Sequence, residues 1–183
     1  MSPEEIRAVL EQIGASRVVQ PDHAARGVHV DALVAPEHLR AAATALRERW
    51  FLIDHVTAVD AAPQMLLVYH FSHPEGGCRA ALKLLADRND PRAPTISDIY
   101  PGANWHERET HDFYGVVFEG HPDLSPLILP EDAGDLRPLR KEEGSLKSLA
   151  ELIPEFGPPP GAQDGEKPAK PRPKAEKAGE EGA

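Results

Sequence analysis

The stretch NWHERETHDFYG, residues 104–115, gathers histidines, charged side chains and aromatic rings at neighbouring positions. Such a combination has three chemical interpretations: a metal site, an acid–base cluster, or a surface that binds another protein. A zinc-protease helix places two histidines four residues apart, so that both face one ion. His106 and His111 are five residues apart, which turns them by roughly 140° around a helix. The spacing therefore excludes chelation of one ion from a regular helix.

The carboxylates of this stretch could instead perform acid–base chemistry. However, Arg108 and Asp112 are four residues apart, a spacing that also suits a pair that only stabilises a helix. The same holds for Glu107 and His111. No nucleophile has recognisable partners, and no glycine-rich phosphate loop of the GxGxxG or Walker type occurs. A stand-alone metal-dependent enzyme that uses the His/Glu cluster remains an alternative, although the spacing does not favour it.

The third interpretation is an interface with another protein. Four residues fall within about 100° of one another around a helix, namely Trp105, Glu109, Asp112 and Phe113. This face is too polar for a core and too aromatic for a surface that binds nothing. Aromatic residues and arginine are enriched at the centres of protein–protein interfaces. Downstream, LSPLILPEDAGDLRPLR sets apolar residues between prolines, which excludes a long helix or a central strand. This extended arm lies along another subunit or packs on its own domain.

Composition limits the class of partner. The formal charge is −10, and residues 157–183 contain as many basic as acidic residues, so the whole charge belongs to residues 1–156. An acidic body argues against nucleic acid, because phosphate binding requires Lys and Arg. Residues 157–183 lack large apolar side chains and predict a disordered tail rich in Pro, Lys and Glu.

The single cysteine, Cys78, excludes a disulfide framework and any cysteine-based zinc or iron–sulfur site within this chain. The first residues, MSPEEIRAVL, carry acids where a signal peptide carries bases. No apolar run approaches the roughly 18 residues that cross a bilayer. We expect a cytoplasmic protein that meets a membrane only through a partner.

The helices and strands that must position residues 104–115 are predicted from the periodicity of apolar residues. Ser2 and Glu5 form a capping box for a first helix that ends at Gly14. Residues 27–34 alternate as in a strand, and a helix from Pro36 has Leu39, Ala43, Leu46 and Trp50 on its inner side.

Residues 51–60 and 65–72 are predicted as neighbouring strands joined by a turn at Ala62–Pro63, and 78–86 as a further strand or short helix. A last short helix has Ser145 as its cap. The fold class is α+β: a mainly antiparallel sheet covered by helices on one face. We expect an α+β domain at 1–120 that ends with the helix of the 104–115 stretch, an extended arm with a short helix at 121–156, and the tail at 157–183.

The segment from Trp105 to Lys141 resembles the signature of the 30-kilodalton subunit of proton-pumping NADH:quinone oxidoreductase (complex I). That signature runs E-R-E-x-x-D-[MLF]-[FY]-G-[IV]-x-F-x-G-H-P-x-L, followed by L-P-E-D and P-L-R-K. It is matched here by Glu107-Arg108-Glu109, Asp112-Phe113-Tyr114-Gly115, Phe118, Gly120-His121-Pro122-Asp123-Leu124, Leu129-Pro130-Glu131-Asp132 and Pro138-Leu139-Arg140-Lys141.

The resemblance implies a non-catalytic, cofactor-free subunit on the inner face of the cell membrane. Its implied partners are the quinone-site subunit, which is related to the large subunit of nickel–iron hydrogenases, and neighbouring iron–sulfur subunits. The same module occurs in membrane-bound energy-converting hydrogenases and formate hydrogenlyases. Ser125-Pro126, Ala133-Gly134 and Glu142-Glu143-Gly144 depart from the respiratory pattern, which leaves both branches open.

Together, residue types and resemblance predict a subunit interface with no catalytic, cofactor or metal ligand in this chain. Its predicted residues are Trp105, Glu107, Arg108, Glu109, Asp112, Phe113, Tyr114, His121, Pro122, Leu124, Leu129, Pro130, Arg137, Arg140 and Lys141.

Overall fold

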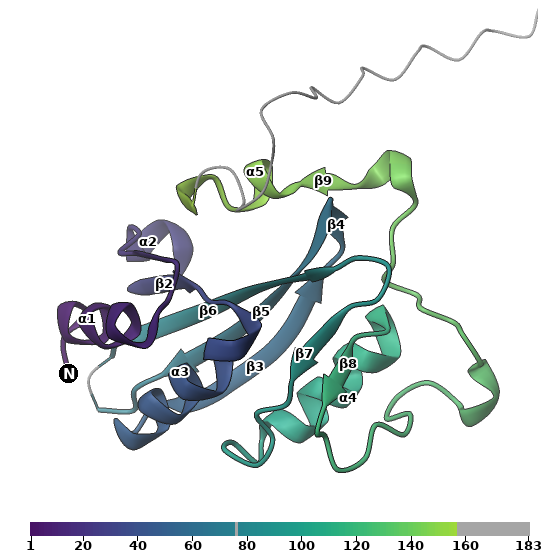
Figure 1. Ribbon diagram of the computed structural model, residues 1–183, viewed down its shortest axis with the longest axis horizontal. Coiled ribbons are helices and arrows are strands. Elements are labelled where there is room, and N and C mark those ends of the chain that lie inside the picture. Colours follow the sequence, from purple (N-terminus) through teal and green to yellow (C-terminus); the bar gives the residue numbers. More distant parts are fainter. Residues whose placement is uncertain (76, 157–183) are drawn as a thin grey trace, which may run out of the picture.

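The computed structural model describes residues 1–75 and 77–156, so the tail expected at 157–183 lies outside the described residues (Figure 1). The helices are α1 Pro3–Ile13, α2 His23–Arg26, α3 Pro36–Glu48, α4 Ala103–Tyr114 and α5 Leu149–Leu152, with 3-10 turns at Glu131–Ala133, Glu143–Ser145 and Pro154–Phe156. The strands are β1 Arg17–Val19, β2 Val30–Leu33, β3 Leu52–Val59, β4 Ala61–Ala62, β5 Gln64–Ser72, β6 Arg79–Asp87, β7 Arg92–Pro94, β8 Val117–Glu119 and β9 Lys147–Ser148.

The main sheet has five strands in the order β1-β2-β6-β5-β3. Only the β2–β6 pair is parallel; the other three pairs are antiparallel, which confirms the predicted α+β class. Residues 78–86, left open between strand and helix, lie in or beside β6. The strand β3 is an edge of this sheet, and α4 packs beside it.

The first helix forms as its sequence predicts. The hydroxyl of Ser2 accepts a hydrogen bond from the backbone N–H of Glu5, whose carboxylate accepts one from the N–H of Ser2. The helix ends at Gly14. Its residues Ile6 and Leu10 are fully buried in the main core, and each such side chain contributes roughly 1.5–3 kcal/mol.

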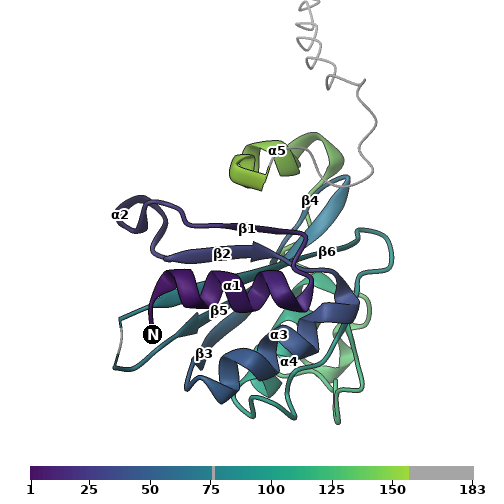
Figure 2. The same ribbon diagram turned by 60° about the vertical axis from the view of Figure 1, so that its left-hand side comes forward.

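Alternation along β5 divides the sheet between two cores. Met65, Leu67 and Tyr69 belong to the main core with α1 and α3, whereas Leu66 and Val68 face the other side. Figure 2 shows α1 and α3 side by side against the sheet, with α5 away from them near β4.

The expectation that helices cover one face only was incomplete. Leu149, Ile153 and Phe156 at the end of the arm pack on the second face against Leu33 and Leu66. The whole of β2 is therefore buried, rather than alternate residues of it. The last helix is capped by Ser148, not by Ser145, because the Ser148 hydroxyl accepts from the N–H of Glu151.

One predicted core residue was also wrong. The helix α3 ends at Glu48, and Trp50 adopts a positive φ of 63° and is exposed. The chain reverses here, so that Phe51 takes the buried position and its N–H bonds to the carbonyl of Leu46. The apolar periodicity of the sequence extends to Trp50, but the turn after α3 directs this side chain into solvent.

Two small sheets bring distant segments together. The parallel pair β7–β8 lies beside α4, and the parallel pair β4–β9 attaches the end of the arm to the residues after β3. The arm between β8 and β9 holds only short 3-10 turns. It is therefore attached to the domain at both of its ends.

Candidate subunit interface

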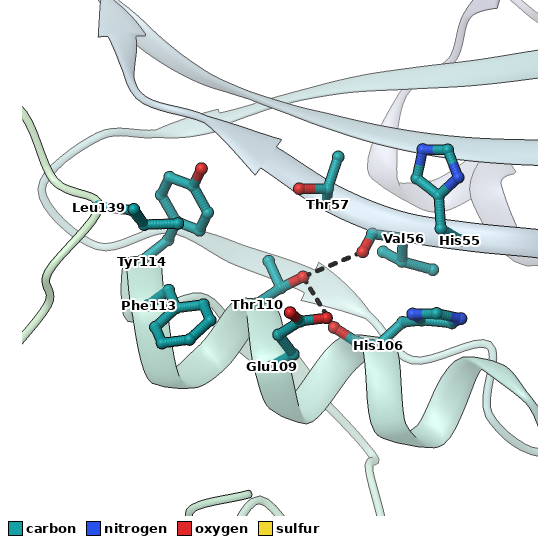
Figure 3. A pocket seen from close by; sticks show the side chains of 9 residues that line it. All are labelled: His55, Val56, Thr57, His106, Glu109, Thr110, Phe113, Tyr114 and Leu139. Carbon is teal, nitrogen blue, oxygen red and sulfur yellow. Dashed lines mark hydrogen bonds between the residues drawn. The ribbon is translucent and has the colours of Figure 1, made fainter. Parts of the chain in front are cut away.

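The helix α4 is fixed to the edge strand by a polar contact. The hydroxyl of Thr110 donates within the helix to the carbonyl of His106, 2.8 Å away, and lies 3.3 Å from the carbonyl oxygen of Val56 in β3. One face of α4 therefore looks toward the sheet (Figure 3). The predicted interface residues of α4 are divided between this side, where Glu109, Phe113 and Tyr114 lie, and the other faces of the helix.

Glu107 lies inside the domain rather than on a surface. Its Oε1 accepts a hydrogen bond from the backbone N–H of Ile96, and its Oε2 accepts one from the hydroxyl of Thr95. Burial raises the pKa of Glu107 to about 7, against the hydrogen bonds, which lower it. The side chain is fully buried in its own chain, and its contact with a partner stays a prediction.

His121 completes this buried cluster at the start of the arm. Its Nδ1 accepts a hydrogen bond from the backbone N–H of Asp123, so the ring proton resides on Nε2. Nε2 lies 3.3 Å from the carbonyl oxygen of Asn104 and 3.8 Å from Oε2 of Glu107. Burial lowers the pKa of His121. The side chain is fully buried within the chain, and its predicted role at the interface stays a prediction.

Asp112 organises the backbone of the arm. Its Oδ2 accepts hydrogen bonds from three successive N–H groups, those of Leu127, Ile128 and Leu129, at 2.8–3.1 Å. Burial alone would raise the pKa of Asp112, but these three donors outweigh it and the pKa is lowered. The carboxylate is thus an internal anchor, buried within the chain.

Arg108 holds the same part of the arm from another position of α4. Its guanidinium donates to the carbonyls of Ser125 and Pro126, each 3.0 Å away. The predicted helix pairs Arg108–Asp112 and Glu107–His111 are therefore wrong, because the arm supplies better placed partners. His111 instead bonds through Nδ1 to the carbonyl of Val116 at 2.8 Å.

A second anchor holds the far end of the arm. The buried carboxylate of Asp60 pairs with Arg88 at 2.8 Å, lies 3.4 Å from Nε of Arg140 and accepts the N–H of Lys141 at 2.7 Å. Arg140 also donates to the carbonyl of Arg88. Arg140 and the backbone of Lys141, both in the predicted interface, thus form contacts within the chain. No motif marked Asp60 or Arg88.

Arg137 lies over the end of α4. Gly115 ends the helix with a φ of 78°, and a Cβ placed there would lie 2.9 Å from Nε of Arg137. The guanidinium donates to the carbonyl of Leu136 at 2.8 Å. The glycine is required twice, for its backbone conformation and for this close approach.

The other predicted residues occupy different depths. Leu124 packs against the main core and Leu129 is half-buried, whereas Pro130 is exposed. Trp105 and Pro122 are exposed and line a hollow of about 400 Å³.

A groove of about 390 Å³ runs between α4 and β3 and is shown in Figure 3. It is lined by His55, Val56, Thr57, His106, Glu109, Thr110, Phe113, Tyr114 and Leu139. The fixed arm also leaves large apolar side chains in solvent: Ile128 is 55% exposed and Leu136 is 53% exposed. Whether these surfaces bind another subunit stays a prediction.

The arrangement of side chains and helices has two further properties. Within residues 1–75 and 77–156, no three side chains of His, Cys, Asp or Glu are grouped so as to hold a metal ion. None of the helices in the same ranges combines the length and the apolar character that crossing a membrane requires.

Comparison with known proteins gives a family match that includes the segment from Trp105 to Lys141. Residues 32–147 match the family model described as "Respiratory-chain NADH dehydrogenase, 30 Kd subunit". An NADH-quinone oxidoreductase subunit of Roseiflexus sp. (strain RS-1) is 36% identical over 116 residues, which span 60% of this chain and 66% of that protein. The equivalent subunit of Moorella thermoacetica is 40% identical over 122 residues, spanning 63% of this chain and 81% of that one.

Two solved structures share the fold. A chain of the membrane-bound sulfane sulfur reductase, an archaeal respiratory membrane complex, superposes with a TM-score of 0.65 and 28% identity over 92% of this chain and 98% of that one. The trypsin-resistant fragment (1-134) of Nqo5 superposes with a TM-score of 0.55 and 26% identity, over 67% of this chain and all of the fragment. The chain therefore belongs to the 30-kilodalton subunit family of NADH:quinone oxidoreductases and related membrane-bound complexes.

Proposed function

We propose that this chain is a non-catalytic subunit in the peripheral arm of a complex-I-like NADH:quinone oxidoreductase. It docks on the quinone-site subunit, which is related to the large subunit of nickel–iron hydrogenases, near the iron–sulfur subunits. By holding that subunit in place it supports electron transfer to quinone and the coupled pumping of ions. The chain itself carries no cofactor, and it reaches the inner face of the membrane only through the complex.

The observation that carries this proposal is the conformation of the arm. Asp112 and Arg108 fix its first part, and Asp60 fixes its end, so its backbone is ordered before any partner arrives. Ile128 and Leu136 nevertheless remain exposed. A segment that is already ordered loses little entropy on binding, and each large apolar side chain that becomes fully buried adds roughly 1.5–3 kcal/mol.

The test replaces the exposed apolar residues of the arm. A chain with Ile128→Ser and Leu136→Ser should retain its fold, because neither side chain is in a core, but should lose the quinone-site subunit on co-purification. Leu52→Ser is the matched control, since Leu52 is 51% exposed on β3 and outside the arm. Recovery of the partner at wild-type levels by the double variant would refute the proposed docking surface.

The absence of a cofactor needs a separate measurement. The purified chain should contain far less than one zinc, iron or nickel per molecule and no flavin, and should show no turnover alone. Stoichiometric metal that survives dialysis against a chelator would favour a stand-alone metal-dependent enzyme instead.

A second candidate is the equivalent subunit of a membrane-bound energy-converting complex, such as a hydrogenase or a formate hydrogenlyase. The superposition with the sulfane sulfur reductase chain over 92% of this chain favours it. The co-purifying subunits distinguish the two. A flavin-containing NADH-binding subunit supports the respiratory complex, and a large subunit with four nickel-ligating cysteines supports the hydrogenase type.

A further inference from the structure

We propose that the groove between α4 and β3 binds an arginine side chain carried by the partner subunit. This inference rests on the proposed docking function and specifies one contact within it. The groove occupies the side of α4 that faces β3, and Leu139 of the arm lies at its rim (Figure 3). A protein that covers Leu139, which is 41% exposed, therefore also reaches the groove.

The groove contains one carboxylate that has no basic partner among the described residues. Of the residues that line it, only Glu109 is of the Asp, Glu, Lys or Arg type. Glu109 lies on α4 between Phe113 and His106 and is half-buried (Figure 3). Within residues 1–75 and 77–156, no Lys or Arg side chain lies within ion-pair distance of it; its neighbour Arg108 is bonded to the arm. Arg108 and Glu109, the two adjacent charged residues, thus have different surroundings: Arg108 is bonded to the arm, whereas Glu109 lines the groove.

The surroundings of Glu109 select an arginine. A carboxylate that shares a groove with the aromatic rings of Phe113 and Tyr114 offers a guanidinium two kinds of interaction. The planar fork pairs with the two carboxylate oxygens, and its face stacks on an aromatic ring. An ammonium group is a compact, strongly hydrated charge that gains less from such a site.

The charge of the whole chain favours the same occupant. The formal charge of −10 attracts basic segments of a partner and repels acidic ones. The other carboxylates of α4, Glu107 and Asp112, already accept hydrogen bonds within the chain. Glu109 is consequently the carboxylate of α4 that is available to a partner's cation.

The first test uses the isolated chain and a small probe. N-acetyl-arginine amide is titrated against the isotope-labelled chain, with N-acetyl-lysine amide as the comparison. We expect saturable shifts of the amide signals of Thr57, Glu109 and Phe113 that are larger with the arginine probe and absent in Glu109→Gln. Glu75→Gln is the matched control, because Glu75 lies beside the aromatic Trp50 in a separate hollow. Equal responses to both probes, or an unchanged response in Glu109→Gln, would overturn the proposal.

The second test measures assembly. Glu109→Gln keeps the shape of the side chain but loses its charge, and should weaken binding of the partner subunit about tenfold; Glu109→Lys should weaken it further. The serine variants of Ile128 and Leu136 separate this inference from the docking function. If they lose the partner while both Glu109 variants bind it normally, the docking surface stands and the arginine site is refuted.

Discussion

Asp112 shows how one side chain can order a segment of irregular backbone. Three N–H groups converge on a single oxygen, and none of the residues that supply them lies in a helix or strand. A donor that loses its acceptor in a buried position costs roughly 1–3 kcal/mol. The carboxylate thus replaces the hydrogen bonds that regular secondary structure provides elsewhere.

We expect Asp112→Ala to release residues 127–129 while the domain stays folded. Hydrogen exchange at these amides should accelerate by roughly tenfold for each 1.4 kcal/mol of lost local stability. Asp123→Ala is the control, since it removes an exposed hydrogen bond to the N–H of Ser125 that water can replace. Unchanged exchange at 127–129 would show that the arm has another anchor.

Glu107 gives the chain a pH dependence of defined sign. Its pKa rises from the usual 4.5 to about 7 in the folded chain, because burial disfavours the charged form. The stability that the neutral form contributes is complete below pH 4.5 and is lost as the pH rises through 7. The difference between the two pKa values corresponds to about 3 kcal/mol.

The substitution Glu107→Gln tests this effect, because glutamine stays neutral at every pH. The free energy of unfolding of the variant minus that of the wild type should increase by about 3 kcal/mol between about pH 4.5 and pH 9. Urea denaturation at both pH values measures it, and comparison with the variant cancels the titration of other groups. If the difference in free energy of unfolding does not change with pH, the pKa of Glu107 is not raised by burial and this prediction is wrong.

At the scale of elements, the junction between α4 and β8 depends on Gly115. Alanine in the left-handed region costs roughly 1–2 kcal/mol, and here its Cβ would also displace Arg137. Gly27→Ala is the control for strain alone, because Gly27 has a φ of 74° and a Cβ added there would meet nothing within 4 Å.

We expect Gly115→Ala to lower the melting temperature more than Gly27→Ala does. In a chain that already carries Arg137→Ala, the additional loss should fall to that of the control. Equal losses in both backgrounds would mean that Arg137 moves aside without cost.

Local sequence patterns predicted the helices and strands that are determined by residues close to one another in the sequence. The capping box at Ser2, the helix across the signature and the alternation of β5 all involve neighbours within a few residues. The partners of the signature residues could not be predicted in this way. Asp60 bonds to the N–H of Lys141, which is 81 positions away, and no spacing encodes that contact.

The same limit applies to the predicted interface residues. Aromatic, acidic and basic side chains on one helix are typical of a surface for a partner, yet they serve equally well to hold the chain's own arm. Glu107, Asp112 and Arg140 do the second, whereas Glu109 and Trp105 remain accessible. Residue types alone do not distinguish an internal docking site from an external one.

At the scale of the whole molecule, the arm and the domain have separable roles. We expect a chain that ends at Gly120 to keep its folded domain, because the buried residues of the main core end at Phe118, but to lose the partner subunit. It should be less stable than the whole chain, because removal of Leu149 and Ile153 uncovers the second face of the sheet. Circular dichroism and co-purification test both statements.

Removal of residues 157–183 alone is the control for that truncation and should leave assembly unchanged. If this shorter deletion abolishes assembly, or if the chain that ends at Gly120 still binds its partner, the arm is not the docking element.

The attachment of the arm at both ends has a consequence for how its length can change. Between the anchor at 127–129 and the anchor at 140–141, the chain bridges two fixed points of the domain. Doubling the length of such a bridge costs only about 0.6 kcal/mol in closure entropy. Insertions around the exposed Gly134 should therefore leave the domain intact while they reshape the surface that the bridge presents. This bridge is therefore the part of the arm whose surface can change without altering the fold.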